Sequence, residues 1–239
     1  MQKTCQQSRV VDKDKRECYN YFIVETMTVK KFLERLLKER APGPYPSFSV
    51  FHLTKALELI AEEGPIGRGK LSEKLKTGEG VARTLINRLM NAGLIDISKP
   101  GCSLTKEGER VWKEFQSIFP RKVRLEQQSE LTLAACNVAM LIKGCGDKVK
   151  VGMDQRDAAI MMGAKGATTL VFKNQTLLLP GWPTSVNVAQ DFPGAFNQIA
   201  KLLEPEENDA IVIGSADTWE KAEYGALAAA WTLIADNCG

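Results

Sequence analysis

The segment 69–110 constrains the fold of this chain more than any other, because it predicts two helices separated by one short turn. It reads GKLSEKLKTGEGVARTLINRLMNAGLIDISKPGCSLTKEGER. Leu71 and Leu75 lie four residues apart, which places both on one face of a helix over 70–76. The dipeptide Thr77-Gly78 then ends that helix.

The second helix of this segment is predicted over 79–93. Its apolar stripe is formed by Val81, Leu85 and Leu89. Gly93 ends the helix, since glycine adopts the left-handed conformation without steric cost. Residues 94–98 alternate like a half-buried strand, 99–101 form a turn, and 103–105 return as a second strand.

The ordered motifs L-S-E-x-L, N-A-G-L-I and S-L-T-K-E-G resemble the winged helix-turn-helix of many prokaryotic transcription regulators. The resemblance covers residues 47–119. It implies that the second helix lies in the major groove of duplex DNA, with cations nearby on phosphates.

Carried over by position, the resemblance assigns the DNA contacts. The candidate base readers are Arg83, Thr84, Asn87 and Arg88. The candidate phosphate contacts are Lys70, Ser72 and Lys99. Arginine suits guanine and asparagine suits adenine by bidentate geometry. The alternative is an ordinary solvated helix face on a winged helix that contacts proteins.

The 239 residues suit two domains, and the charge distribution differs between them. Residues 1–47 carry a net charge of +4, 48–119 carry +2, and 120–239 carry −3. The basic excess therefore lies with the predicted DNA-binding half, as phosphate neutralisation requires. Its size is modest, and it would not by itself indicate nucleic acid.

Cysteine and histidine usage argues against a metal site. The six cysteines are scattered without a C-x-x-C pair, and His52 is the single histidine. The usual cysteine and histidine zinc arrangements therefore cannot form. We expect reduced thiols, no cofactor, a cytoplasmic location and no membrane span, since no apolar run approaches about 20 residues. His52 is expected to have a structural role.

The N-terminal part is predicted in two pieces. Residues 1–26 lack sustained periodicity and are expected to be a disordered extension, with Met27 as the true start. Residues 27–46 are expected to form a helix and a proline-rich linker. The winged helix-turn-helix follows over 47–120, with Ser47 as the cap of its first helix. An α/β domain is predicted over 121–239.

The α/β domain shows a different pattern from the first. Apolar runs predict strands over 131–142, 168–172, 177–179 and 210–213, with a further short strand over 149–151. Helices are predicted over 154–163, 191–203 and 218–235. The order β-α-β-β-α-β-α predicts a two-layer α/β sandwich, for which a ferredoxin-like arrangement is the nearest candidate. The whole chain is thus of α+β or α/β class.

A second resemblance covers nearly everything after Ser47. The run MDQRDAAIMMGAKGATTL from Met153 and the later DAIVIGSADT are similar to an uncharacterised archaeal family that joins a winged helix to a C-terminal domain of unknown function. The resemblance implies only a transcription regulator. From the residues themselves, we expect no enzyme activity.

A small-molecule site is predicted where strands and helices of the second domain meet. Its candidate residues are Arg156, Asp157, Lys165, Ser215 and Asp217. The two cations would hold a carboxylate or phosphate, and Asp217 would orient an amine or hydroxyl. Alternatively, the two aspartates cap helices and Arg156 pairs with a neighbouring acid.

The function predicted from these features is a cytoplasmic, dimeric DNA-binding regulator. Its second domain would sense an effector or build the dimer. A ligand-handling or catalytic second domain with a protein-binding winged helix is the main alternative, and RNA binding is another. No Ser-His-Asp or Cys-His arrangement can form within the second domain, because His52 belongs to the first.

Overall fold

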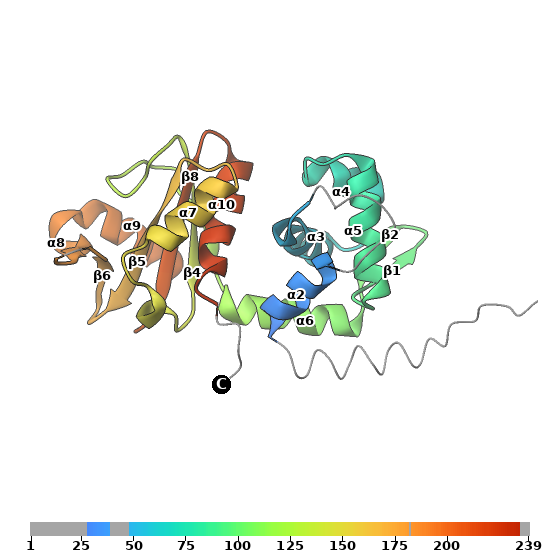
Figure 1. The fold of residues 1–239 in the computed structure, drawn as a ribbon, viewed down its shortest axis with the longest axis horizontal. Helices are drawn as coiled ribbons and strands as arrows, with labels where there is room; N and C mark the ends of the chain where they lie inside the picture. Colours follow the sequence, from blue (N-terminus) through green and yellow to red (C-terminus); the bar gives the residue numbers. More distant parts are fainter. Residues whose placement is uncertain (1–27, 39–47, 182, 235–239) are drawn as a thin grey trace, which may run out of the picture. The chain divides into compact units, whose positions relative to one another are not determined.

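The computed structural model describes residues 28–38, 48–181 and 183–234, and the chain forms two compact units (Figure 1). The division falls between Val111 and Trp112. It lies inside helix α6 (Lys106–Ile118), earlier than the boundary predicted at residue 120. The predicted extension over 1–26 and the proline-rich linker lie outside the described residues.

The body of the first unit is helical. Its helices are α2 (Val29–Lys38), α3 (Val50–Glu63), α4 (Arg68–Lys74) and α5 (Glu79–Asn91). The predicted stripes form its core, whose fully buried side chains include Leu33, Leu53, Leu57, Leu71, Leu75, Leu85 and Leu89. Burying one face of each helix in this way supplies most of the stability that short helices lack in isolation.

The cap of α3 differs from the predicted Ser47, which lies outside the described residues. Ser49 is the N-cap, and its backbone N–H donates to Nδ1 of His52 at 3.1 Å. His52 thus takes the place that Glu or Gln usually holds in a capping box. Its role is structural, as predicted.

The wing is the hairpin of β1 (Ile95–Ser98) and β2 (Gly101–Leu104), which pair antiparallel. Just before α4, Ile66 adds a single antiparallel bridge to Cys102 of this hairpin. Gly101 has a φ of +143°, and a Cβ there would come within 2.6 Å of the Ile66 carbonyl carbon. Only glycine therefore allows the hairpin to approach Ile66 so closely.

The second unit is built on one six-stranded antiparallel sheet of order β3-β4-β8-β5-β6-β7. The strands are β3 (Lys122–Arg124), β4 (Cys136–Ile142), β5 (Gly166–Lys173), β6 (Thr176–Leu179), β7 (Val186–Asn187) and β8 (Ala210–Ala216). The helices are η1 (Gly146–Lys148), α7 (Met153–Met161), α8 (Val188–Asp191), α9 (Pro193–Leu203) and α10 (Trp219–Trp231). Strand β8 lies at the centre and is buried along its whole length.

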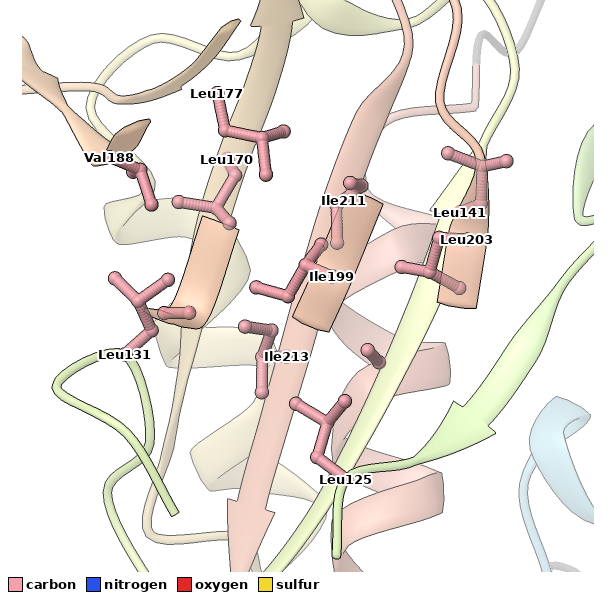
Figure 2. Close-up of a cluster of buried hydrophobic side chains, with 12 residues drawn as sticks. Leu125, Leu131, Leu141, Leu170, Leu177, Val188, Ile199, Leu203, Ile211 and Ile213 are labelled. Atoms are coloured by element: carbon pink, nitrogen blue, oxygen red, sulfur yellow. The ribbon is translucent and has the colours of Figure 1, made fainter. Parts of the chain in front are cut away.

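Helices cover both faces of this sheet. Figure 2 shows one face, where Ile199 and Leu203 of α9 pack on Leu141, Ile211 and Ile213. Alternate residues of β8 point to the opposite face. There, a Cβ at Gly214 would overlap the carbonyl oxygen of Ala222 and the backbone nitrogen of Ala226 in α10. Helix α7 packs beside α10 on that same side.

The α+β class and the succession of two domains are confirmed, whereas the finer topology differs from the prediction. Three layers replace the two expected, because α9 lies on one face and α7 with α10 on the other. A ferredoxin-like sheet places its first and third strands side by side at the centre. Here the last long strand, β8, lies between β4 and β5 instead.

Several boundaries also differ. The predicted strand over 131–142 begins only at Cys136, because a hydrogen-bonded turn joins Ser129 and Thr132. Residues 149–151 form no strand. The helix expected over 191–203 is divided at Pro193, which starts α9. No helix in the described residues is both long and apolar enough to cross a membrane.

Candidate nucleic-acid interface

The exposed face of α5 carries two of the predicted base readers. Arg83 and Asn87 are both exposed and lie four residues apart, so they occupy one side of the helix. Within the described residues, Arg83 makes no ion pair. Thr84 is half-buried, and its hydroxyl donates to the Gly80 carbonyl at 3.0 Å. This face offers a free guanidinium and a free amide, the two groups suited to guanine and adenine.

Arg88 is wrongly placed among the base readers by the sequence prediction. Its residue exposure is only 7%, and its Nη1 donates to the carbonyl oxygens of Leu36, at 2.6 Å, and of Leu37. Its guanidinium also lies over the Phe48 ring, 5.2 Å from the centroid. Those two carbonyls belong to the last turn of α2, where carbonyls lack partners within the helix. Arg88 therefore caps α2 and holds it to α5.

The prediction for Ser72 is also wrong. Ser72 is buried, and its hydroxyl donates to the Thr77 carbonyl at 2.7 Å. That contact fixes the turn between α4 and α5, in which Lys76 adopts a left-handed φ of +52°. Lys76 is exposed and makes no ion pair among the described residues. Lys76 is therefore a further candidate phosphate contact, which was not among the residues predicted from the sequence.

The cations of α4 are already paired. The Glu63 carboxylate forms ion pairs with Nζ of Lys70, at 2.9 Å, and with Nζ of Lys74, at 2.8 Å. The hydrogen bonds from Lys74 and then Lys70 lower the pKa of the Glu63 carboxyl. Arg68 lies 3.3 Å from Glu79 at the start of α5. These pairs are exposed and therefore weak, so phosphate groups can compete for the cations.

The wing contributes one further cation. Lys99 lies in the turn between β1 and β2, where it is exposed and without an ion pair in the described structure. The Ser98 hydroxyl donates to the Gly101 carbonyl at 3.2 Å and closes this turn. Lys99 and Lys76 are therefore both free to contact phosphates.

The predicted small-molecule residues lie near one another in the second unit, yet their charges are paired. Arg156 contacts Asp157 at 2.8 Å, and Lys165 contacts Asp217 at 3.1 Å. The Cγ atom of Arg156 lies 3.8 Å from the point where Gly166 would carry a Cβ. Because Gly166 follows Lys165 directly, the two ion pairs are neighbours. The alternative for Arg156, pairing with a neighbouring acid, matches this geometry.

Neither aspartate serves as a helix cap. Asp157 lies inside α7, and the N-cap of α10 is Thr218, whose hydroxyl accepts from the Lys221 N–H. Ser215 is fully buried; it donates to Asn137 at 2.7 Å and accepts from the Leu133 N–H at 3.1 Å. It thereby holds the loop before β4 and is closed to a ligand.

The described residues contain no group of three or more potential metal ligands. Their cysteines, Cys102, Cys136 and Cys145, are free thiols. Burial raises the pKa of Cys102 and of Cys145, which keeps both protonated at neutral pH.

Comparison with known proteins matches one family model to each part of the chain. Residues 54–119 match a family model described as the CggR N-terminal DNA binding domain. The first unit is a winged helix-turn-helix. Residues 133–233 match a model described as a domain of unknown function, DUF4443. The chain thus joins a winged helix-turn-helix to a C-terminal domain of unknown function, as the resemblances implied.

Among solved structures, the chain is similar to hypothetical protein PH0730 from Pyrococcus horikoshii OT3. The two share 27% identity with a TM-score of 0.63, over 78% of this chain and 93% of that one. A multiple antibiotic-resistance repressor (MarR) from Listeria monocytogenes 4b F2365 shares 13% identity, with a TM-score of 0.28, over 43% of this chain and 67% of its own. RV1404 from Mycobacterium tuberculosis shares 20%, with a TM-score of 0.27, over 48% and 77%. Scores as low as these last two do not indicate a shared fold. No match to a curated protein was found.

Proposed function

We propose that this protein is a sequence-specific DNA-binding transcription regulator that reads duplex DNA with the exposed face of α5. The observation that carries the proposal is the match of residues 54–119 to a DNA-binding domain model. The geometry supports it, since α5 is the second helix of the helix-turn-helix and presents Arg83 and Asn87 to solvent.

Each exposed side chain has a proposed task. Arg83 binds O6 and N7 of a guanine, and Asn87 binds N6 and N7 of an adenine. Lys99 of the wing and Lys76 of the turn bind phosphates. Lys70 joins them when a phosphate displaces Glu63, its partner in the free protein.

Base reading and phosphate binding can be separated experimentally. Duplexes selected from a randomised pool by the full chain and by Arg83→Ala should differ at one base position, at a cost of about 1–3 kcal/mol for the preferred base. Lys99→Ala should weaken all duplexes equally and lower the salt slope by about one. Lys201→Ala, which removes an exposed cation of α9 in the second unit, is the control.

The outcome that contradicts the assignment is specific. Unchanged affinity and base preference in Arg83→Ala would show that α5 does not read bases through Arg83. Tighter binding of single-stranded or structured RNA than of duplex DNA would show an RNA-binding protein instead.

The second unit is proposed to make the protein a homodimer. A dimer would read an inverted repeat with half-sites one helical turn, or a multiple, apart. A small-molecule effector has weaker support, because Arg156 and Lys165 are each neutralised by an aspartate and Ser215 is buried. The role proposed for the second unit is therefore dimerisation, without catalysis. A cytoplasmic location of the protein is supported by the free thiols of the three described cysteines.

A further inference from the structure

The outer face of α7 carries three large apolar side chains that are exposed to solvent. Met153 is 52% exposed, Ile160 48% and Met161 85%. The inner face of the same helix is already occupied. There, Ala159 lies against Gly225 of α10, and Gln155 donates to the Thr232 hydroxyl at 2.6 Å. The outer side chains are therefore available to a partner.

These exposed side chains form one continuous patch. Met153, Arg156 and Ile160 follow each other at intervals of three and four, so they adjoin on the helix surface. Leu133, which is 55% exposed, extends the patch beyond the helix. Its Cδ1 lies 2.9 Å from where Gly166 would carry a Cβ, and the Arg156 stem lies 3.8 Å from the same point. Figure 1 shows α7 as the yellow helix on the viewer's side of the second unit.

The order of residues along α7 is self-complementary under two-fold symmetry. In an antiparallel pair of identical helices, the residue that precedes the midpoint on one copy lies opposite the residue that follows it on the other. With the midpoint between Arg156 and Asp157, Met153 of one copy lies opposite Ile160 of the other. The same register places Arg156 opposite Asp157 at the centre.

From this charge and apolar complementarity we infer that the outer face of α7 is a homodimer interface whose occupant is a second copy of this chain. The Arg156–Asp157 pair within one chain then exchanges for two equivalent pairs between chains. The apolar residues on either side exclude water from these pairs, which strengthens them. Leu133 enlarges the contact beyond the helix, which is only about 14 Å long at 1.5 Å per residue.

This inference deepens the homodimer proposed above, and it is tested without DNA. The full chain is examined by sedimentation velocity over a range of concentrations. In a two-fold interface, Arg156→Asp brings four carboxylates together, and Asp157→Arg brings four guanidinium groups together. We expect each single variant to raise the dimer dissociation constant at least about tenfold, since like charges in an interface repel strongly.

Two further samples distinguish this register from a general loss of stability. Mixing the two single variants should restore a dimer, because each copy then meets the opposite charge. The double variant Arg156→Asp with Asp157→Arg should dimerise alone, since it exchanges the two charges without changing their sum. Lys201→Asp, an exposed change on α9 across the sheet, is the control and should leave the dimer intact.

Three results would overturn the inference. They are a wild-type chain that stays monomeric at all concentrations, single variants that dimerise as the wild type does, and a mixture that fails to recover the dimer. A monomer that still selects specific duplexes would refute this interface alone. A dimer that selects no duplex would refute the proposed DNA reading alone.

Discussion

Replacing Arg88 by methionine should undock α2 from the first unit. Methionine keeps the apolar stem but removes the Nη1 that donates to the carbonyls of Leu36 and Leu37. A hydrogen bond from a charged donor contributes about 1.5–3 kcal/mol. The guanidinium over Phe48, 5.2 Å from the ring centroid, adds about 0.5–2 kcal/mol.

The loss of stability in Arg88→Met should be smaller than the sum of the hydrogen-bond and cation–π contributions. Once α2 is released, its carbonyls regain water, and single substitutions rarely cost more than about 4–5 kcal/mol. We therefore expect Arg88→Met to lower the free energy of unfolding of the first unit by about 3–5 kcal/mol. Helix α2 should be the first part to lose protection.

The assay is chemical denaturation combined with hydrogen exchange of the amides in α2. Arg83→Met is the matched control, because it makes the same chemical change on the exposed side of α5. It should alter stability by no more than about 0.5 kcal/mol. If Arg88→Met proved as stable as the control, with α2 amides exchanging as in the wild type, the structural role assigned to Arg88 would be refuted.

Three further predictions concern packing and titration. Gly214→Ala should destabilise the second unit by about 3 kcal/mol or more in thermal unfolding, because its Cβ would overlap the Ala222 carbonyl oxygen; an unchanged melting temperature would contradict the packing of α10. Gly101→Ala should speed amide exchange in the wing, since its Cβ would lie 2.6 Å from the Ile66 carbonyl carbon, and unchanged exchange would contradict that contact. Burial lowers the pKa of His52 below its ordinary 6.5, so in this pH range the unfolded chain binds more protons than the folded chain. The contribution of His52 to the free energy of unfolding should therefore be fully present above pH 6.5 and be lost as the pH drops through the folded-state pKa. NMR titration of this single imidazole measures the shift, and His52→Gln should lose this part of the pH dependence.

The helices and the wing of the first unit were predictable from the sequence because their signals are local. Leu71 with Leu75, and the stripe on α5, mark buried faces through spacing alone. The turn residues before Gly101 and the alternation over 94–98 are equally local. The helix ends moved by only a few residues, since side-chain contacts such as that of Ser72 with Thr77 decide where a helix stops.

The side of α5 on which Arg88 lies could have been predicted from its spacing to Arg83. A residue advances about 100° around a helix, so Arg88 lies about 140° from Arg83 and cannot share its face. That angle, applied to the sequence, would have removed Arg88 from the base readers. Its actual partners, Leu36 and Leu37, are remote in sequence, and no local pattern could have identified them.

The sheet order of the second unit depended on contacts that are equally remote. Strand β8 comes late in the chain yet lies between β4 and β5, and its burial on both faces suits a central strand. The edge strands β3 and β7 span three and two residues, too few to show a periodic pattern. Among the predicted ligand residues, Lys165 and Asp217 flank strands β5 and β8, whereas Arg156 and Asp157 lie in α7. The pairing of each cation with an aspartate could be found only from the fold.

The most direct test of DNA reading by α5 is fluorescence anisotropy with duplex DNA from upstream of the gene for this protein. The full chain is titrated at two salt concentrations, with a scrambled duplex of the same composition as competitor. We expect the upstream duplex to bind clearly more tightly than the scrambled one, and the affinity to fall as salt rises, because phosphate contacts release counterions. Absence of binding even at low salt, or equal binding of both duplexes, would contradict sequence-specific reading by Arg83 and Asn87.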